Sequence, residues 1–233
     1  MEIPKTIHYI WMGGKKKPYV LRRCIKMWHK RLKGYKIIEW NEKNFPIDEH
    51  PFAKRAYEAK QWAFVSDYVR SWVIYNHGGV YFDTDIMVIR PIDDLLKNDA
   101  FVGFESKKYP FTAVFGATKH HPFVRDMLSG YDDKKMEYDF KDNNTISASE
   151  ILIKKYGCKA NNKEQLLKTG IRVYSDGVLC SPSLDSYTVH LFYGGWKNSG
   201  RNMKNIWREV LRGFILTSPR RIKMYYFFLR KKG

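Results

Sequence analysis

FVSDYVRSWVIYNHGGVYFDTDI, residues 64–86, is the stretch that decides the fold. Apolar residues at helical spacing predict a single helix from Phe52 to His77, and the two glycines after His77 end it. The β-branched and aromatic run Val80–Phe82 then predicts an interior strand that ends at Asp83. This order indicates an α/β unit with an acidic residue at the carboxyl end of a buried strand.

Strand and helix signals alternate on both sides of this stretch. Upstream, the sequence predicts strands at Lys5–Trp11 and Tyr35–Trp40 around an amphipathic helix at Tyr19–Leu32. Downstream, the predicted strands are Ile86–Ile89, Ala100–Phe104 and Thr112–Phe115. We therefore expect an α/β fold with a mostly parallel central sheet flanked by helices, and a ligand site beyond the carboxyl ends of its strands. The glycine-rich dinucleotide fingerprint and the P-loop are both absent, so phosphates need another binding group.

Asp83 and Asp85 stand between two apolar runs. In extended backbone, residues two apart point to the same side, so both carboxylates can meet at one point. Oxygen ligands of this kind suit Mg²⁺ or Mn²⁺, which share their coordination sphere with substrate phosphates, and this indicates a diphosphate substrate. The alternative is a solvated turn. The apolar flanks favour the cation, because they make uncompensated charge expensive.

Asp67 and Arg70 lie three residues apart on one face of the predicted long helix. They form either a plain surface ion pair or a binding pair. In the second case the carboxylate faces sugar or ribose hydroxyls and the guanidinium faces the donor's sugar or phosphate.

The positive charge is concentrated towards the end of the sequence. The net charge is +18, and residues 197–233 hold eleven basic residues against the single acid Glu209. We expect a catalytic domain at residues 1–200 and basic amphipathic helices at residues 201–233. Such a segment attracts polyanions of any kind.

The aromatic run Tyr225–Leu229 precedes the cations Arg230–Lys232, a pattern that predicts an interfacial anchor on an anionic membrane. A C-terminal helix docked on the domain is the alternative. The sequence shows neither a secretory signal nor about 18 consecutive apolar residues, and its three cysteines form no disulfide or zinc pattern. We expect a cytoplasmic protein, peripheral on the inner face of the membrane.

Three blocks resemble glycosyltransferase family 32, the DXD sugar-binding type, in their order and spacing. They are IPKTIHYIWMGG at 3–14, the stretch at 64–86, which is the most specific, and HLFYGGW at 190–196. The family includes capsular polysaccharide enzymes and initiating mannosyltransferases, and it is akin to the glucosyltransferase domains of large bacterial toxins. The resemblance implies a GT-A type nucleotide-diphospho-sugar transferase fold and transfer with retention of anomeric configuration.

The resemblance also implies roles for particular residues. By this likeness Trp11 stacks on the donor base, and Asp67 and Arg70 contact the ribose and the sugar. Asp83 and Asp85 flank a divalent cation, Mn²⁺ or Mg²⁺, and Asp85 binds it most directly. Asp83 is thus a donor-binding residue as well as a metal ligand.

The last block supplies two further expected residues. His190 is the expected third contact to the metal or the diphosphate, although a lone histidine after a strand is often structural. Trp196 lies where the family closes the donor site. The chain departs from the family at Gly195, where a serine is common, and at residues 144–147, which replace the usual Thr-Gly-Pro segment on the acceptor side.

Together these features predict a metal-dependent glycosyltransferase that moves a hexose from a nucleotide-diphosphate sugar, with UDP as the expected carrier. The expected acceptor is a glycan or lipid-linked glycan, as in capsular or surface polysaccharide synthesis. Asp83, Asp85 and Arg70 are the expected catalytic residues. No side chain stands out as a nucleophile, so we expect front-face substitution. A nucleic-acid binding protein that uses the basic tail and a metal-dependent phosphohydrolase are the alternatives, and we expect no specific nucleic acid partner.

Overall fold

The computed structural model describes residues 2–132 and 144–194 of the 233-residue chain. Its helices are α1 (Tyr19–Arg31), α2 (Pro51–Glu58), α3 (Trp62–His77), α4 (Pro122–Ser129), α5 (Asn144–Lys154) and α6 (Asp176–Leu179). Its strands are β1 (Thr6–Ile10), β2 (Lys36–Trp40), β3 (Gly79–Phe82), β4 (Ile86–Val88), β5 (Ala100–Gly103), β6 (Val114–Ala117), β7 (Gln165–Leu166), β8 (Ile171–Tyr174) and β9 (Thr188–His190). Residues 195–233, and with them the predicted tail helices, lie outside this part of the chain.

Seven strands form the central sheet in the order β2-β1-β3-β6-β5-β8-β7. The pairs β1–β2, β1–β3 and β5–β8 are parallel, while β6 runs antiparallel to both of its neighbours and β7 to β8. All strands but β6 and β7 therefore point the same way, which confirms the predicted α/β fold with a mostly parallel sheet. The strand predicted at Ile86–Ile89 forms as β4, but it pairs only with β9, in a separate two-stranded sheet.

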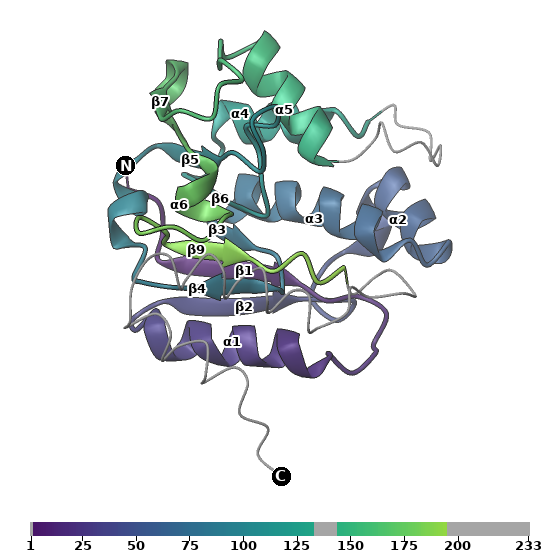
Figure 1. Ribbon diagram of the computed structural model, residues 1–233. Helices are drawn as coiled ribbons and strands as arrows, with labels where there is room; N and C mark the ends of the chain where they lie inside the picture. Colours follow the sequence, from purple (N-terminus) through teal and green to yellow (C-terminus); the bar gives the residue numbers. More distant parts are fainter. Residues whose placement is uncertain (1, 133–143, 195–233) are drawn as a thin grey trace.

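Helices cover both faces of the central sheet (Figure 1). α1 lies on one face, with β4 and β9, around a core that includes Trp28, Phe82 and Leu191. α2 and α3 lie on the other face, and their core includes Val69 and Phe115. The indole nitrogen of Trp28 donates a hydrogen bond to the carbonyl of Ile86, at 2.7 Å. α1 thus fixes the strand that follows the two aspartates.

The helix predicted from Phe52 to His77 is wrong in one respect, because the structure divides it into α2 and α3. The break falls at residues 59–61, where Lys60 has a φ of 57°. The amide of Gln61 donates to the carbonyl of Ala56, which closes the first helix. Neither glycine nor proline marks this position, so apolar periodicity runs across it unchanged.

Gly79 and His8 hold β3 close to β1. Gly79 has a φ of +102°, and a Cβ on it would lie 2.7 Å from the carbonyl oxygen of Thr6, so the position requires glycine. His8 is 1% exposed; its Nδ1 accepts from the indole of Trp40 and its Nε2 donates to the carbonyl of Gly78, each at 3.0 Å. Burial lowers the pKa of His8 to about 4, so the imidazole is neutral.

We expect this histidine to make the fold sensitive to acid. Between about pH 6.5 and pH 4 the unfolded chain protonates His8 and the folded chain does not, so the free energy of unfolding falls as the pH falls. Urea unfolding at pH 7 and pH 5 should show a loss about 2 kcal/mol larger in the wild type than in His8→Gln, which keeps one donor and one acceptor but does not titrate. An equal loss in both proteins would assign the acid sensitivity to other groups.

Within residues 2–132 and 144–194, none of the helices combines the length and the apolar character needed to cross a membrane.

Candidate donor and metal site

The two aspartates follow β3 in a tight turn, not in the extended backbone predicted from the sequence. The amide of Ile86 donates to the carbonyl of Asp83 at 3.1 Å, which closes a turn over residues 83–86. The turn reverses the chain from the central sheet into the small β4–β9 sheet. The carboxylates of Asp83 and Asp85 nevertheless lie close together, as predicted. The reason for this is the turn, and not the alternation of an extended strand.

Arg70 connects α3 with this turn. Its guanidinium lies 2.9 Å from a carboxylate oxygen of Asp67 and 3.4 Å from Oδ1 of Asp83. The hydroxyl of Tyr81 donates to the same Oδ1 at 2.6 Å, and the guanidinium carbon lies 4.6 Å from the centre of the Tyr81 ring. The predicted pair of Asp67 and Arg70 is therefore no plain surface ion pair, because it is mostly buried and includes the turn after β3.

The charges around Arg70 stabilise its cationic form. Burial alone would lower the pKa of Arg70, but the carboxylates of Asp83 and Asp67 raise it above its ordinary value. Burial also raises the pKa of Tyr81, so this phenol keeps the proton that it donates to Asp83. Sequence reasoning missed Tyr81. The signal was present, because a residue two places before Asp83 in a strand shares its side of the sheet.

Asp85 and His190 form a second, buried pair. Nε2 of His190 lies 3.4 Å from Oδ1 of Asp85, and the amide of Tyr193 donates to Oδ2 at 2.7 Å. Burial alone would raise the pKa of Asp85, but the His190 charge lowers it. Burial alone would lower the pKa of His190, and Asp85 raises it well above the ordinary value. The register of β4 against β9 sets Ile86 opposite His190, which brings the histidine to the turn.

Asp83, Asp85 and His190 offer a chemically suitable set of metal ligands. One ligand atom from each lies within 4.8 Å of the others. Two carboxylates and one imidazole suit a divalent cation of the Mg²⁺ or Mn²⁺ kind, whose remaining positions water and phosphate oxygens fill. Among the residues that the structure describes, this is the one group of three or more acidic, histidine or cysteine side chains with this spacing. A bound cation would add to the compensation of the Asp85 carboxylate by His190 and the Tyr193 amide.

Trp11 lies at the same edge of the sheet. It follows β1, and the register of β1 with β3 sets Ile7 opposite Val80, so that Trp11 is level with the turn after Phe82. Its indole nitrogen donates to the carbonyl of Lys15 at 2.6 Å, and the Lys17 ammonium lies 5.5 Å from its ring centre. Trp11 thus lies at the same carboxyl edge of the sheet as the turn that carries Asp83 and Asp85. Trp196 lies outside the described residues.

This fold has a counterpart among solved structures. A sheet of this order, with an acidic turn after β3 at its carboxyl edge, is the GT-A fold of the glycosyltransferases, as predicted. The solved structure of PaToxG glycosyltransferase shares it, with a TM-score of 0.51 and 16% identity over 66% of this chain and 69% of that one. Residues 18–102 carry the family region described as "glycosyltransferase sugar-binding region containing DXD motif". The resemblance to glycosyltransferase family 32 is thereby confirmed.

Curated proteins are similar to part of this chain. The chain is 32% identical over 73 residues to human alpha-1,4-N-acetylglucosaminyltransferase, which covers 31% of this chain and 20% of that protein. It is 27% identical over 145 residues to inositol phosphoceramide mannosyltransferase 3 of Schizosaccharomyces pombe, with 59% and 40% covered. The chain thus spans less than half the length of these relatives.

Proposed function

We propose that this protein is a divalent-metal-dependent glycosyltransferase that transfers a hexose from a nucleotide-diphosphate sugar to a glycan or a lipid-linked glycan. The convergence of Asp83, Asp85 and His190 at the carboxyl edge of a GT-A sheet carries this proposal. The sugar-binding region at residues 18–102 supports it. A role in capsular or surface polysaccharide synthesis is the setting that we infer, with UDP as the carrier.

Each residue has a definite task in this proposal. Asp85, Asp83 and His190 would hold Mn²⁺ or Mg²⁺, and the bound cation would supply positive charge to neutralise the departing diphosphate. The Tyr81 hydroxyl and the Arg70 guanidinium both contact Oδ1 of Asp83 and hold this carboxylate in place. Trp11 receives the base.

Arg70 and Asp67 bind the sugar and ribose side of the donor. The guanidinium is held in place before any donor binds, because it is fixed by Asp67 and Asp83. A fixed cation stabilises charge that develops on the leaving group without a reorganisation of the site. Trp196 would close the donor site from the segment after β9.

A donor screen tests the proposal directly. The purified chain is incubated with UDP- and GDP-linked hexoses and Mn²⁺, and release of the nucleoside diphosphate is measured. We expect release with one donor class, its loss in EDTA and its return with added Mn²⁺ or Mg²⁺. Release of inorganic phosphate from simple phosphate esters would favour the phosphohydrolase instead. If no sugar nucleotide releases its nucleoside diphosphate with either metal, the proposal is wrong.

We propose that transfer retains the anomeric configuration by front-face substitution. In this route the diphosphate leaves while one of its oxygens helps to deprotonate the incoming hydroxyl, so the protein needs no nucleophile below the sugar. The stereochemistry of the product, read from the NMR coupling constant of its anomeric proton, tests retention. A covalent sugar adduct trapped on the protein would exclude the front-face route.

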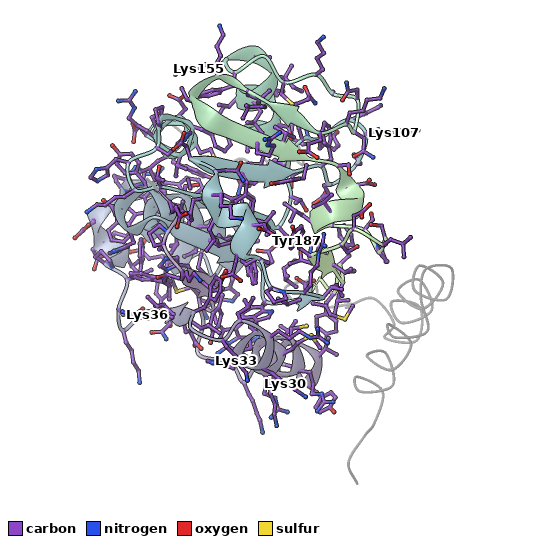
Figure 2. All side chains as sticks on the ribbon, turned by 90° about the vertical axis from the view of Figure 1, so that its left-hand side faces the viewer. Lys30, Lys33, Lys36, Lys107, Lys155 and Tyr187 are labelled. Carbon is purple, nitrogen blue, oxygen red and sulfur yellow. The ribbon has the colours of Figure 1, made fainter. Side chains whose placement is uncertain are left out.

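We propose further that the protein is cytoplasmic and attaches to an anionic membrane surface. Besides the basic segment at residues 197–233, residues 3–38 contain eleven Lys and Arg and no acidic residue. Figure 2 shows Lys30, Lys33 and Lys36 around the lower end of the domain, at α1 and the start of β2. Basic surfaces of this kind attract anionic headgroups.

Vesicle binding checks this attachment. We expect sedimentation with phosphatidylglycerol vesicles to exceed that with phosphatidylcholine vesicles about tenfold or more at low salt, and to fall as salt is added. Competition with single-stranded oligonucleotide separates lipid from nucleic acid, and tight, salt-resistant oligonucleotide binding would favour the nucleic-acid alternative. Equal binding to both kinds of vesicle would contradict the membrane proposal.

A further inference from the structure

Glu105 lies near the metal ligands, although neither the sequence motifs nor the family region, which ends at residue 102, includes it. It follows β5 by two residues, at the same edge of the sheet as Trp11 and Asp83. Its amide donates to the carbonyl of Tyr109 at 2.9 Å, and the Tyr109 amide donates to the carbonyl of Ser106, at 3.1 Å. This turn fixes the backbone of Glu105.

The surroundings of Glu105, and not the alternation of β5, locate its side chain. Glu105 lies in a bend past the end of the strand, where alternation no longer applies. Its carboxyl group interacts electrostatically with His190 and Asp83, so it lies close to the turn that carries the two aspartates.

Cys180 connects the two positions. Its thiol contacts the carbonyl of Glu105 at 3.9 Å, and its own carbonyl accepts from the amide of His190 at 2.8 Å. Glu105 also interacts electrostatically with His190, Asp83 and Arg70. Burial raises the pKa of Glu105, and the charge of Asp83 adds to this effect. In the ranges 2–132 and 144–194, the carboxyl group of Glu105 has no hydrogen-bond or ion-pair partner.

The strand order shows which part of a donor lies there. At the carboxyl edge the strands run β1, β3, β6, β5, so Trp11 stands on one side of the metal ligands and Glu105 on the other. With the base on Trp11 and the diphosphate at Asp83 and Asp85, the hexose extends towards β5. A half-buried carboxyl group without a protein partner is a suitable acceptor for sugar hydroxyls.

We propose that Glu105 binds the hexose of the donor through hydrogen bonds to its hydroxyl groups. This inference rests on the proposed function, because it requires that a sugar nucleotide occupies the site. Glu105 is not one of the metal ligands in this arrangement, since the group that converges on one point contains Asp83, Asp85 and His190 alone among the described residues. Its contribution concerns the sugar and not the diphosphate.

Two affinities measured by calorimetry in Mn²⁺ test this role. The probes are UDP and UDP-glucose, or GDP and GDP-mannose if the donor screen selects guanine. For Glu105→Gln we expect affinity for the sugar nucleotide to fall about tenfold or more, with affinity for the nucleoside diphosphate within a factor of about two of the wild type. Glu150→Gln, on the exposed side of α5, is the matched control and should change neither affinity.

Other outcomes overturn the inference. Unchanged affinity for both probes would remove Glu105 from the donor site. An equal fall for both would mean that it acts through the metal ligands or the fold, and the melting temperature of the variant distinguishes these two causes. A wild type that binds no sugar nucleotide contradicts the proposed function itself, so this failure is distinct from a failure of Glu105.

Discussion

Asp85→Asn is expected to lower sugar transfer by about 10³-fold or more, since the proposed metal would contribute several kcal/mol to stabilisation of the leaving group. Asp85 is 7% exposed and lies against His190, so its charge interacts with neighbouring groups of the site and little with solvent. Asparagine keeps the shape and still accepts the amide of Tyr193, which Oδ2 accepts in the native protein. The fold should therefore persist while the cation loses its most direct ligand.

The measurements are nucleoside diphosphate release and Mn²⁺ affinity for the same preparation. Both should fall together in Asp85→Asn, whereas Asp185→Asn, on an exposed loop, should leave both unchanged. A variant that keeps the Mn²⁺ affinity and turnover of the wild type would show that the cation, if any, is held elsewhere.

Arg70→Met is expected to damage both stability and activity. It leaves Asp67 and Asp83 without the cation that lies between them, and removal of one partner from a buried charge group costs about 3–5 kcal/mol. Loss of the fixed cation that we propose to stabilise the leaving group should lower transfer by at least about 100-fold at saturating donor. Urea unfolding and donor turnover measure the two effects separately.

Two further variants make this result specific. Arg172→Met breaks an exposed pair with Glu164 and should change the free energy of unfolding by less than about 1 kcal/mol. Asp67→Asn in the Arg70→Met background should restore part of the stability, because it removes one of the two carboxylates that Arg70 contacts in the native protein. If Arg70→Met has the same free energy of unfolding as the wild type, the ion pairs of Arg70 with Asp67 and Asp83 do not stabilise the fold.

The sequence contained most of the fold because its signals are local. The apolar runs before and after Asp83 form β3 and β4, and the glycines after His77 end α3 as predicted. The break near Lys60 left no local signal, since an exposed lysine can adopt a positive φ without a glycine. The antiparallel direction of β6 could not be predicted either, because the composition of a strand does not show whether it runs parallel or antiparallel to its neighbours.

The site was predictable to the extent that its residues lie in motifs. The acidic pair, Arg70 and His190 came from the sequence, and the structure brings them to one turn. Glu105 was missed because a single acid after an apolar strand is common, and only the strand order shows that it faces the same edge as Asp83. The direction of a side chain at the end of a strand depends on tertiary packing, which residue spacing does not report.

The pairing of β4 with β9 has a consequence for synthesis on the ribosome. The amide of Tyr193 and the carboxylate of Asp85 are 108 positions apart in sequence. Because chains fold from the N-terminus as they emerge, the helix that carries Arg70 and the acidic turn can be in place long before their imidazole partner has been translated. Until β9 docks against β4, the nascent domain then lacks one of the three proposed metal ligands.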